Sequence, residues 1–329
     1  MSVRHMIVSL ASLLPLLAGC STSPTAAQDP KKEPKDQFAQ DQVVEMPKPM
    51  PFEGERAMAY LKKLCDLGPR VSGGSGMIRQ QELLKAHFEK FGAKVEFQSF
   101  EVRQHSQARP TRMANLIVTW FPDRERRLLL CGHYDTRPLA DQESDRRNWT
   151  KPFLSANDGT STTAFFMEWA HHISALDLKV GLDFVLFDGE EYIFEPGRDQ
   201  YFLGSKHFAA EYRRRPPNHR YIAGVLLDLF AGQNAVYPVE GNSLFHAAAL
   251  AEDIWRLAAA LNVTSFKWVQ GPTVDDDHLA LNAVGIPTID VIDFNYPHWH
   301  KLSDLPENCS ADSMAKVSRV LSVWVQRVR

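Results

Sequence analysis

Residues 128–135 read LLLCGHYD, a short apolar run that ends abruptly in polar side chains. Residues 182–191 read LDFVLFDGEE and repeat that order, with carboxylates directly after the apolar run. Short apolar runs of this kind are typical of strands that are buried on both faces of a sheet. The two stretches therefore predict buried strands whose carboxyl ends carry charged side chains.

Other segments extend this pattern into a whole fold. Apolar runs also occupy residues 114–120, 222–227 and 287–292, and Val95 and Phe97 alternate with polar residues as in a partly exposed strand. Apolar residues at helical spacing over 77–91 end at Gly92, and Ser243 and Ser310 are expected to cap two further helices. The alternation predicts an α/β fold, a single domain with a central mixed, mostly parallel sheet flanked by helices.

Carboxylates and imidazoles follow most of the predicted strands. In open α/β sheets, ligands bind just beyond the carboxyl ends of the strands, so these side chains are expected to meet. The polar segments after the strands are 132–135, 188–191, Asp228, and Asp293 with 296–300, and the segments 155–159 and 275–278 add further acidic and His side chains.

A bound cation explains why so many such segments converge. Carboxylates that are packed together repel one another and are driven to protonate unless a positive charge lies among them. Oxygen and imidazole ligands without thiolates favour zinc, held by three protein side chains with one position open for chemistry. The candidate residues for this metal site are Asp158, Glu190, Glu191 and His300. Any one of them alone would be weak evidence for a metal site, so the prediction rests on their occurring together at one edge of the sheet.

The N-terminal residues have the features of an export signal. Arg4 and His5 precede an apolar run over 6–17, which is shorter than the ~20 residues that a membrane-spanning helix needs. The residues LAGC at 17–20 look like a bacterial lipobox, in which Cys20 is acylated. We therefore expect a signal peptide over 1–19, a lipidated Cys20 and flexible linker over 20–52, and a folded domain over 53–329. The protein would be an exported lipoprotein of the bacterial cell envelope, periplasmic or extracellular, that contacts the membrane only through this anchor.

Charge and cysteine content narrow the possible functions. The net charge of −3 gives no reason to expect nucleic acid as a partner. Beyond Cys20 the chain has Cys65, Cys131 and Cys309, and no two of them have the spacing of metal ligands. At most one disulfide is possible, so stability is expected to come from hydrophobic burial.

Several motifs together resemble one enzyme family. GHYD at 132–135, NDG at 157–159, DGEE at 188–191 and LGSKH at 203–207 resemble the zinc aminopeptidases of peptidase family M28, and LGPRVSG at 67–73 is similar to the start of that family. The resemblance covers residues 55–329 and implies the fold of those aminopeptidases. Within it, the long insert 192–202, LLDL at 226–229, and DDDH at 275–278 with WH at 299–300 look more like the glutaminyl-peptide cyclotransferases.

This resemblance implies a reaction and a metal. Asp158, Glu191 and His300 would bind one zinc ion, and Glu190 would shuttle protons. The reaction would convert the N-terminal glutamine of a peptide or protein into pyroglutamate, with release of ammonia. The enzyme class implied is an acyltransferase.

The resemblance also implies roles around the substrate. Asp228 and Asp276 would form a buried acid network near the substrate amine, and Trp299 and Tyr296 would flank the substrate side chain. Three places depart from the cyclases. Residues 194–197 stand where they carry a Trp, Asp290 where they have a His, and Thr163 where the animal enzymes have one member of a cysteine pair. None of these departures changes a residue that is expected to bind zinc. They are expected to affect which substrates the enzyme prefers.

A second interpretation stays open. His133 and Asp228 could bind a second zinc ion, with Asp158 bridging the two. Glu190 would then activate a water molecule in a two-zinc aminopeptidase that hydrolyses N-terminal residues. A non-catalytic binding module on the same fold would need Glu190 or His300 to be missing, and both are present.

Overall fold

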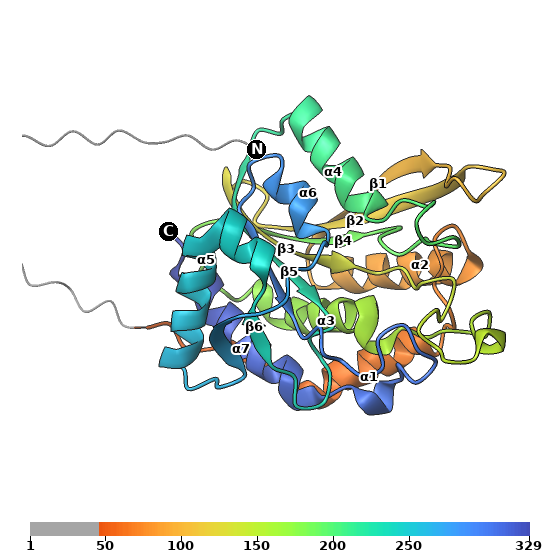
Figure 1. Ribbon diagram of the computed structural model, residues 1–329. Coiled ribbons are helices and arrows are strands. Elements are labelled where there is room, and N and C mark those ends of the chain that lie inside the picture. The colour runs from red at the N-terminus through yellow and green to blue at the C-terminus, as the bar shows by residue number, and fades with distance from the viewer. Residues whose placement is uncertain (1–45) are drawn as a thin grey trace, which may run out of the picture. The chain divides into compact units, whose positions relative to one another are not determined.

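A six-stranded sheet runs through the centre of the structure, a computed structural model that describes residues 46–329 (Figure 1). Its strands, in spatial order, are β1 (Lys94–Val102), β2 (Thr111–Trp120), β4 (Gly181–Phe187), β3 (Arg126–His133), β5 (Arg220–Asp228) and β8 (Thr288–Ile292). β2 is antiparallel to both β1 and β4, whereas β4, β3, β5 and β8 are parallel to one another. The predicted mixed, mostly parallel sheet is confirmed.

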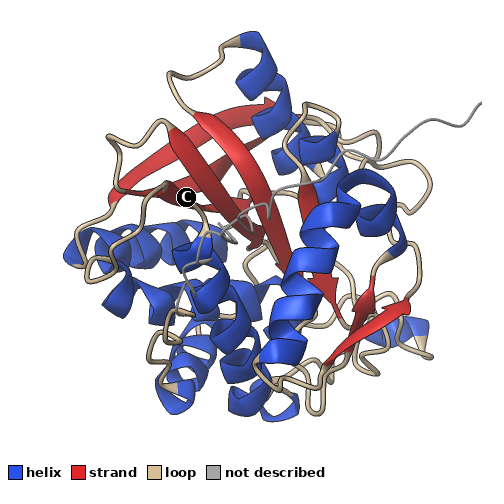
Figure 2. Ribbon diagram, turned by 90° about the vertical axis from the view of Figure 1, so that its left-hand side faces the viewer, coloured by secondary structure: helices blue, strands red, loops and turns tan. Residues whose placement is uncertain are grey.

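Helices cover both faces of the sheet (Figures 1 and 2). One face carries α1 (Gly54–Cys65), α2 (Ser75–Lys90), α3 (Ser161–Ile173), α5 (Gly241–Ala260) and α7 (Ala311–Arg327), and the other carries α4 (Leu203–Arg214) and α6 (His278–Asn282). Shorter pieces are the helical turns η1 (Arg146–Asn148), η2 (Ala156–Thr160) and η3 (Pro306–Asn308), and a two-stranded sheet of β6 (Tyr237–Val239) and β7 (Phe266–Gln270).

The sheet is buried between these layers, which explains the continuous apolar runs of its strands. Leu128 and Leu130 of β3 pack into the larger core, on the side of α3. Leu129 and Cys131 alternate with them and pack on the opposite face, in the core that includes Phe208 of α4. Because both faces are buried, the parallel strands are apolar at most positions rather than at every second one.

The structure tests the two predicted helix caps. Ser310 caps α7 as predicted, since its side chain accepts from the backbone N–H of Ser313. The predicted cap at Ser243 is wrong. α5 begins earlier, and the N-cap is Glu240, whose carboxylate accepts from the backbone N–H of Asn242 and Ser243. A carboxylate can cap as well as a hydroxyl can, and Ser243 lies inside the first turn.

The folded part begins a few residues before the predicted end of the linker. Met50 is 5% exposed and its backbone N–H donates to Ser322, and the ring of Phe52 lies 5.5 Å from that of Phe165. The predicted signal peptide, Cys20 and most of the linker lie outside the described residues. Within residues 46–329, no helix is both long and apolar enough to cross a membrane, and Cys65, Cys131 and Cys309 are unbonded thiols.

Candidate functional site

The predicted site residues lie together at the carboxyl edge of the parallel strands. His133 is the last residue of β3 and Asp228 the last of β5. Glu190 and Glu191 directly follow β4, and Asp158 lies in η2, at the start of α3. His300 comes from the loop after β8. The convergence expected from the parallel topology is therefore present in the structure.

Asp158, Glu191 and His300 form a buried group that could hold a metal ion. Nε2 of His300 lies 2.5 Å from Oε1 of Glu191 and 3.6 Å from Oδ2 of Asp158. None of the three residues is more than 4% exposed. Residues that are 33 and 109 positions apart in sequence (158 to 191, and 191 to 300) thus present ligand atoms to one point.

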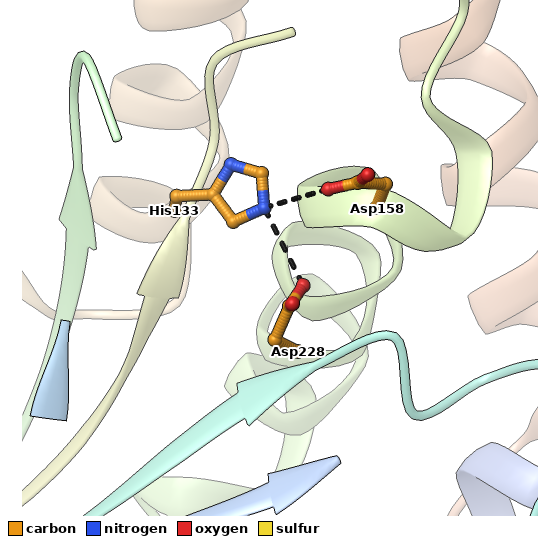
Figure 3. Close-up of side chains that lie close together, drawn as sticks. All are labelled: His133, Asp158 and Asp228. Carbon is orange, nitrogen blue, oxygen red and sulfur yellow. Dashed lines mark ion pairs between the residues drawn. The ribbon is translucent and has the colours of Figure 1, made fainter. Parts of the chain in front are cut away.

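A second group of the same kind shares Asp158. Nε2 of His133 lies 3.0 Å from Oδ1 of Asp158 and 3.4 Å from Oδ1 of Asp228 (Figure 3). Figure 3 shows the imidazole at the end of its strand, with the two carboxylates directed toward its ring nitrogen. His133 also forms a third possible ligand group with Glu190 and Glu191. Asp158 stands between the first two groups, as a bridging carboxylate must.

The unpartnered polar atoms of the site fit a cation. Oδ2 of Asp158, Oε2 of Glu191 and Oδ1 of Asp228 are buried and have no hydrogen-bond donor in the structure. Buried carboxylate oxygens without partners are strongly unfavourable, and a divalent ion with oxygen and imidazole ligands would satisfy them. The donor set contains no thiolate, which fits zinc or a harder divalent metal.

The electrostatics of the site lead to the same conclusion. Burial raises the pKa of Asp158 to about 7, and the charge of Glu191 adds to the rise. Burial alone would also raise the pKa of Glu191, but the imidazolium of His300 outweighs it and holds this pKa at about 2. In turn, burial would lower the pKa of His300, whereas Glu191 and the neighbouring Asp141 raise it to about 9. Without a metal, the His300 imidazolium thus supplies the positive charge next to Glu191. A bound cation would take over this role, with His300 neutral and its Nε2 free to coordinate.

Glu190 differs from its neighbour in both contacts and charge. Its side chain lies at the cavity, 8% exposed, with Oε2 3.9 Å from Nδ1 of His133. Burial, and then the charge of Glu191, raise the pKa of Glu190 well above its usual range. A carboxyl whose pKa is raised, next to a metal site, can both give and take a proton.

Strained backbone conformations occur at this edge of the sheet. His300, Ser155, Phe202 and Leu229 have positive φ angles of 52°, 52°, 63° and 46°, although none of them is glycine. Such conformations are unfavourable and persist where the surrounding structure enforces them, commonly at functional sites. In His300 the strain coincides with a candidate ligand.

Gly159 meets two requirements at once. Its φ is +75°, and a Cβ atom there would lie 2.6 Å from Cε1 of His133. A side chain at position 159 would clash with His133 and would strain the backbone, so only glycine is compatible with the observed position of His133. This gives a physical reason for the Asp-Gly pair in the sequence.

Three aspartates that the sequence did not single out as site residues support the ligands. Asp135 accepts from the backbone N–H of both Glu190 and Glu191, at 3.1 and 3.2 Å. Asp304 accepts from the backbone N–H of Asn157 and Asp158, at 2.9 and 3.2 Å. Asp141 accepts from Nδ1 of His300 at 2.9 Å. Asp135 could have been found from its position two residues after His133, whereas no sequence signal marks Asp141 or Asp304.

The acidic segment before α6 lies beside these residues. Asp276 is 6% exposed and lines the cavity, while Asp277 and His278 are completely buried behind it. Burial, and then the charges of Asp228 and Asp277, raise the pKa of Asp276 well above its usual range. Asp290, which stands where the cyclases have a His, is also fully buried, and neither of its carboxyl oxygens has a partner. Asp277 and Asp290 thus add two buried carboxyls near Asp228 and Asp276.

A cavity of about 520 Å³ opens over the ligand groups. Its walls include Phe294, Trp299, Tyr201, Phe202 and Pro196, and its floor includes Asp158, Glu190, Glu191, Asp228, Asp276 and His300. An apolar wall over a polar floor is the usual form of a site for a small substrate group.

Of the two aromatic residues expected at the substrate, only Trp299 lines this cavity. The structure does not place Tyr296 there. Its hydroxyl donates to Asp304 at 2.8 Å and its side chain is 6% exposed, so it supports the ligand loop from behind. Phe294, whose ring centroid lies 5.1 Å from that of Trp299, occupies the wall instead. The alternation of side chains in this loop, which has no regular structure, could not be read from sequence.

Comparisons with known proteins agree with this geometry. Residues 115–325 match the family described as Peptidase family M28. The chain is 26% identical over 284 residues to the glutaminyl-peptide cyclotransferase of Gloydius blomhoffii, and the match covers 77% of this chain and 75% of that protein.

Solved structures give closer matches. The glutaminyl cyclase of Fimbriiglobus ruber is 50% identical with a TM-score of 0.84, covering 86% of this chain and 97% of that one. A leucine aminopeptidase precursor from Bacteroides thetaiotaomicron is 29% identical with a TM-score of 0.80, covering 87% and 100%. The matched family region contains Asp158, Glu190, Glu191 and His300. The chain belongs to peptidase family M28.

Proposed function

We propose that this protein is a zinc-dependent glutaminyl-peptide cyclotransferase, an acyltransferase that converts N-terminal glutamine into pyroglutamate and ammonia. The observation that carries the proposal is its 50% identity to the Fimbriiglobus ruber glutaminyl cyclase over 97% of that chain, against 29% for the leucine aminopeptidase precursor on the same fold. The substrates would be the N-termini of peptides or proteins, since the relatives are glutaminyl-peptide cyclotransferases.

Asp158, Glu191 and His300 would hold one zinc ion, because they offer three buried ligand atoms around one point. When bound, zinc acts as a Lewis acid that polarises the γ-amide carbonyl of the substrate glutamine. Glu191 and His300 are fixed by Asp135 and Asp141, so the carbonyl would meet a preorganised group of ligands.

Glu190 would move the protons of the reaction. The α-amine of the glutamine attacks its own γ-carbonyl carbon, so a C–N bond of the lactam ring forms. Glu190 takes a proton from that amine and gives one to the amide nitrogen, whose C–N bond breaks to release ammonia. Since the nucleophile is tethered to the carbonyl, orientation in the cavity can contribute up to ~7–11 kcal/mol in well-aligned cases.

The rest of the cavity would orient the amine and exclude water. Asp228 and Asp276 lie on the floor beside Glu190 and would accept hydrogen bonds from the substrate α-amino group. Trp299 and Phe294 would pack on the glutamine side chain from the wall. Water is the competing nucleophile, so a dry cavity favours cyclisation over hydrolysis.

The second candidate function is a two-zinc aminopeptidase. The group of His133, Asp158 and Asp228 favours it, because these residues could hold a second ion that shares Asp158 with the first. Glu190 would then act as the general base toward a water molecule.

One experiment separates these functions. The purified protein is incubated with a peptide that starts with glutamine and, separately, with aminoacyl anilides, while its zinc content is measured. The proposal requires a product that is lighter than the peptide by one ammonia, and one tightly held zinc ion per chain. Release of free amino acids, together with two tightly held zinc ions, would show the aminopeptidase instead.

We also propose that the protein is exported and anchored through an acylated Cys20, on the evidence of the LAGC motif and the apolar run before it. The full chain, expressed in bacteria that are fed a labelled fatty acid, should carry the label in the membrane fraction. The Cys20→Ser variant should be unlabelled. A wild-type chain without label contradicts the anchor and leaves the catalytic proposal unaffected.

A further inference from the structure

The loop after β3 contains a buried cation that the proposed mechanism does not use. Arg137 is only 2% exposed, although it lies next to the cavity. Its Nη2 donates to Oδ2 of Asp141 at 2.7 Å and to the hydroxyl of Tyr201 at 3.0 Å. Its Nη1 lies 3.6 Å from Oε1 of Glu191. One guanidinium group thus contacts three parts of the site.

The first of these contacts continues to a metal ligand. Oδ1 of Asp141 accepts from Nδ1 of His300, while Oδ2 accepts from Arg137. A hydrogen on Nδ1 leaves the lone pair of Nε2 free, and this is the nitrogen that faces Glu191 and Asp158. Asp141 therefore selects the ring orientation and tautomer that a metal at Nε2 requires.

The second contact continues to the wall of the cavity. Tyr201 lies at the end of the 192–202 insert and lines the cavity, with its ring centroid 5.4 Å from the guanidinium carbon of Arg137. Near the same end of the insert, Asp199 accepts from the backbone N–H and hydroxyl of Ser106. The backbone N–H of Phe202 donates to the carbonyl of Glu190 at 3.0 Å. Arg137 adds a side-chain link from the insert to Asp141, which bonds His300.

We propose that Arg137 and Asp141 are positioning residues that fix His300 for the metal and couple it, through Tyr201, to the wall that receives the substrate. Arginine suits this role because its planar fork keeps several donors at fixed angles, whereas lysine is a point charge on a flexible stem. The part that concerns the metal stands on the geometry alone, and the part that concerns substrate affinity rests on the proposed function.

The test uses the holoenzyme and four variants, with zinc affinity measured by competition with a chromophoric chelator. Asp141→Asn keeps the shape of the side chain but replaces one acceptor, so zinc affinity should fall by about 10–100-fold. Arg137→Lys should lower it by a smaller factor and should also raise KM for a glutamine-initiated peptide. Tyr201→Phe should raise KM while zinc affinity and kcat stay close to those of the wild type.

Asp183→Asn is the matched control. Asp183 is a carboxylate that is 1% exposed and bonded to a buried arginine, Arg127, at 2.6 Å, but it lies within β4, away from the ligands. Its variant should lose stability and keep wild-type zinc affinity. Wild-type zinc affinity in Asp141→Asn would overturn the proposal, and so would an equal loss in Asp183→Asn.

Two further outcomes of this experiment also bear on the proposal. If Asp141→Asn does not fold, unchanged zinc affinity in Arg137→Lys overturns the proposal. If the wild type shows no cyclase activity, the function proposed above fails, and the zinc measurements still decide whether Arg137 and Asp141 position His300.

Discussion

Two adjacent glutamates have different tasks because their surroundings differ. Glu191 faces His300, which lowers the pKa of its carboxyl, while Glu190 lies at the cavity, where burial raises the pKa of its carboxyl. The backbone N–H groups of both donate to Asp135, so neither residue can shift without the other. A single turn after β4 thus provides one ligand and one proton carrier.

This division predicts the behaviour of Glu190→Gln. The variant should lose about 10²–10⁴-fold in kcat, because the amide cannot carry a proton, while zinc content stays at the wild-type level. Turnover is measured as ammonia release, and bound zinc by elemental analysis of the same sample. A variant with full turnover would remove Glu190 from the mechanism, and a variant without zinc would make it a ligand.

Gly159 gives a second prediction at this scale. Gly159→Ala should be destabilised by more than the ~1–3 kcal/mol of a strained residue alone, because its Cβ would also displace His133. Gly285→Ala is the matched control, since Gly285 has a similar φ of +82° and no atom within 4 Å of the added Cβ. Denaturant unfolding of both variants measures the difference. Equal losses would show that His133 does not constrain this position.

Single residues of the site could be predicted where sequence order reflects topology. His133 and Asp228 end strands and Glu191 lies in the turn after one, so the parallel arrangement alone brings them to one edge. Asp304 and Arg137 lie in irregular loops, and their contacts depend on how those loops close over the site. Periodicity carries no information about such loops, which is also why Tyr296 was expected at the substrate and Phe294 was missed.

Elements were predicted best where burial is complete on both faces. β4 is buried along its whole length, and its apolar run is clear in the sequence. Helix ends were harder, because the start of α5 depends on a buried carboxylate. Oε1 of Glu240 accepts from the backbone N–H of Asn242 and also from that of Val274, in the segment that lines the cavity. Glu240 and Val274 are far apart in sequence, so no local sequence pattern indicates this contact.

The cap of α5 predicts a pH-dependent contribution to stability. Burial alone would raise the pKa of Glu240, but His278 and three backbone N–H donors hold it at about 2, below its ordinary value of 4.5. A carboxyl with a lowered pKa stabilises the fold above its unfolded pKa, and this stabilisation is lost as pH falls from 4.5 toward 2. A shift of this size corresponds to about 3 kcal/mol at neutral pH.

Glu240→Gln should therefore be less stable than the wild type at pH 7, and the gap should narrow as the pH is lowered below 4.5. Denaturant unfolding at a series of pH values measures it. Ser310→Ala provides the comparison, because it removes a neutral cap from α7 and should lower stability by about 1 kcal/mol at every pH. A gap for Glu240→Gln that does not change with pH would show that its charge is not what caps the helix.

At the scale of the whole molecule, the metal site joins segments that are distant in sequence. Asp158 belongs to the start of α3, Glu191 to the turn after β4, and His300 to the loop after β8. An ion held by all three binds the folded chain and has no comparable site in the unfolded one. Binding therefore adds to the free energy of unfolding according to ligand concentration and affinity.

Zinc removal should thus destabilise the entire fold. With zinc at 100 times its dissociation constant, the gain is about 2.7 kcal/mol, which corresponds to a rise of roughly 4–5 °C in Tm for a domain of this size. Thermal unfolding is recorded before and after chelation, and again after zinc is restored. Asp158→Ala lacks the shared ligand, so its Tm should be the same under all three conditions, and its cyclase activity should be lost. An Asp158→Ala protein that gains as much from zinc as the wild type would mean that the ion does not need Asp158 and is held elsewhere, as in the group of His133, Glu190 and Glu191.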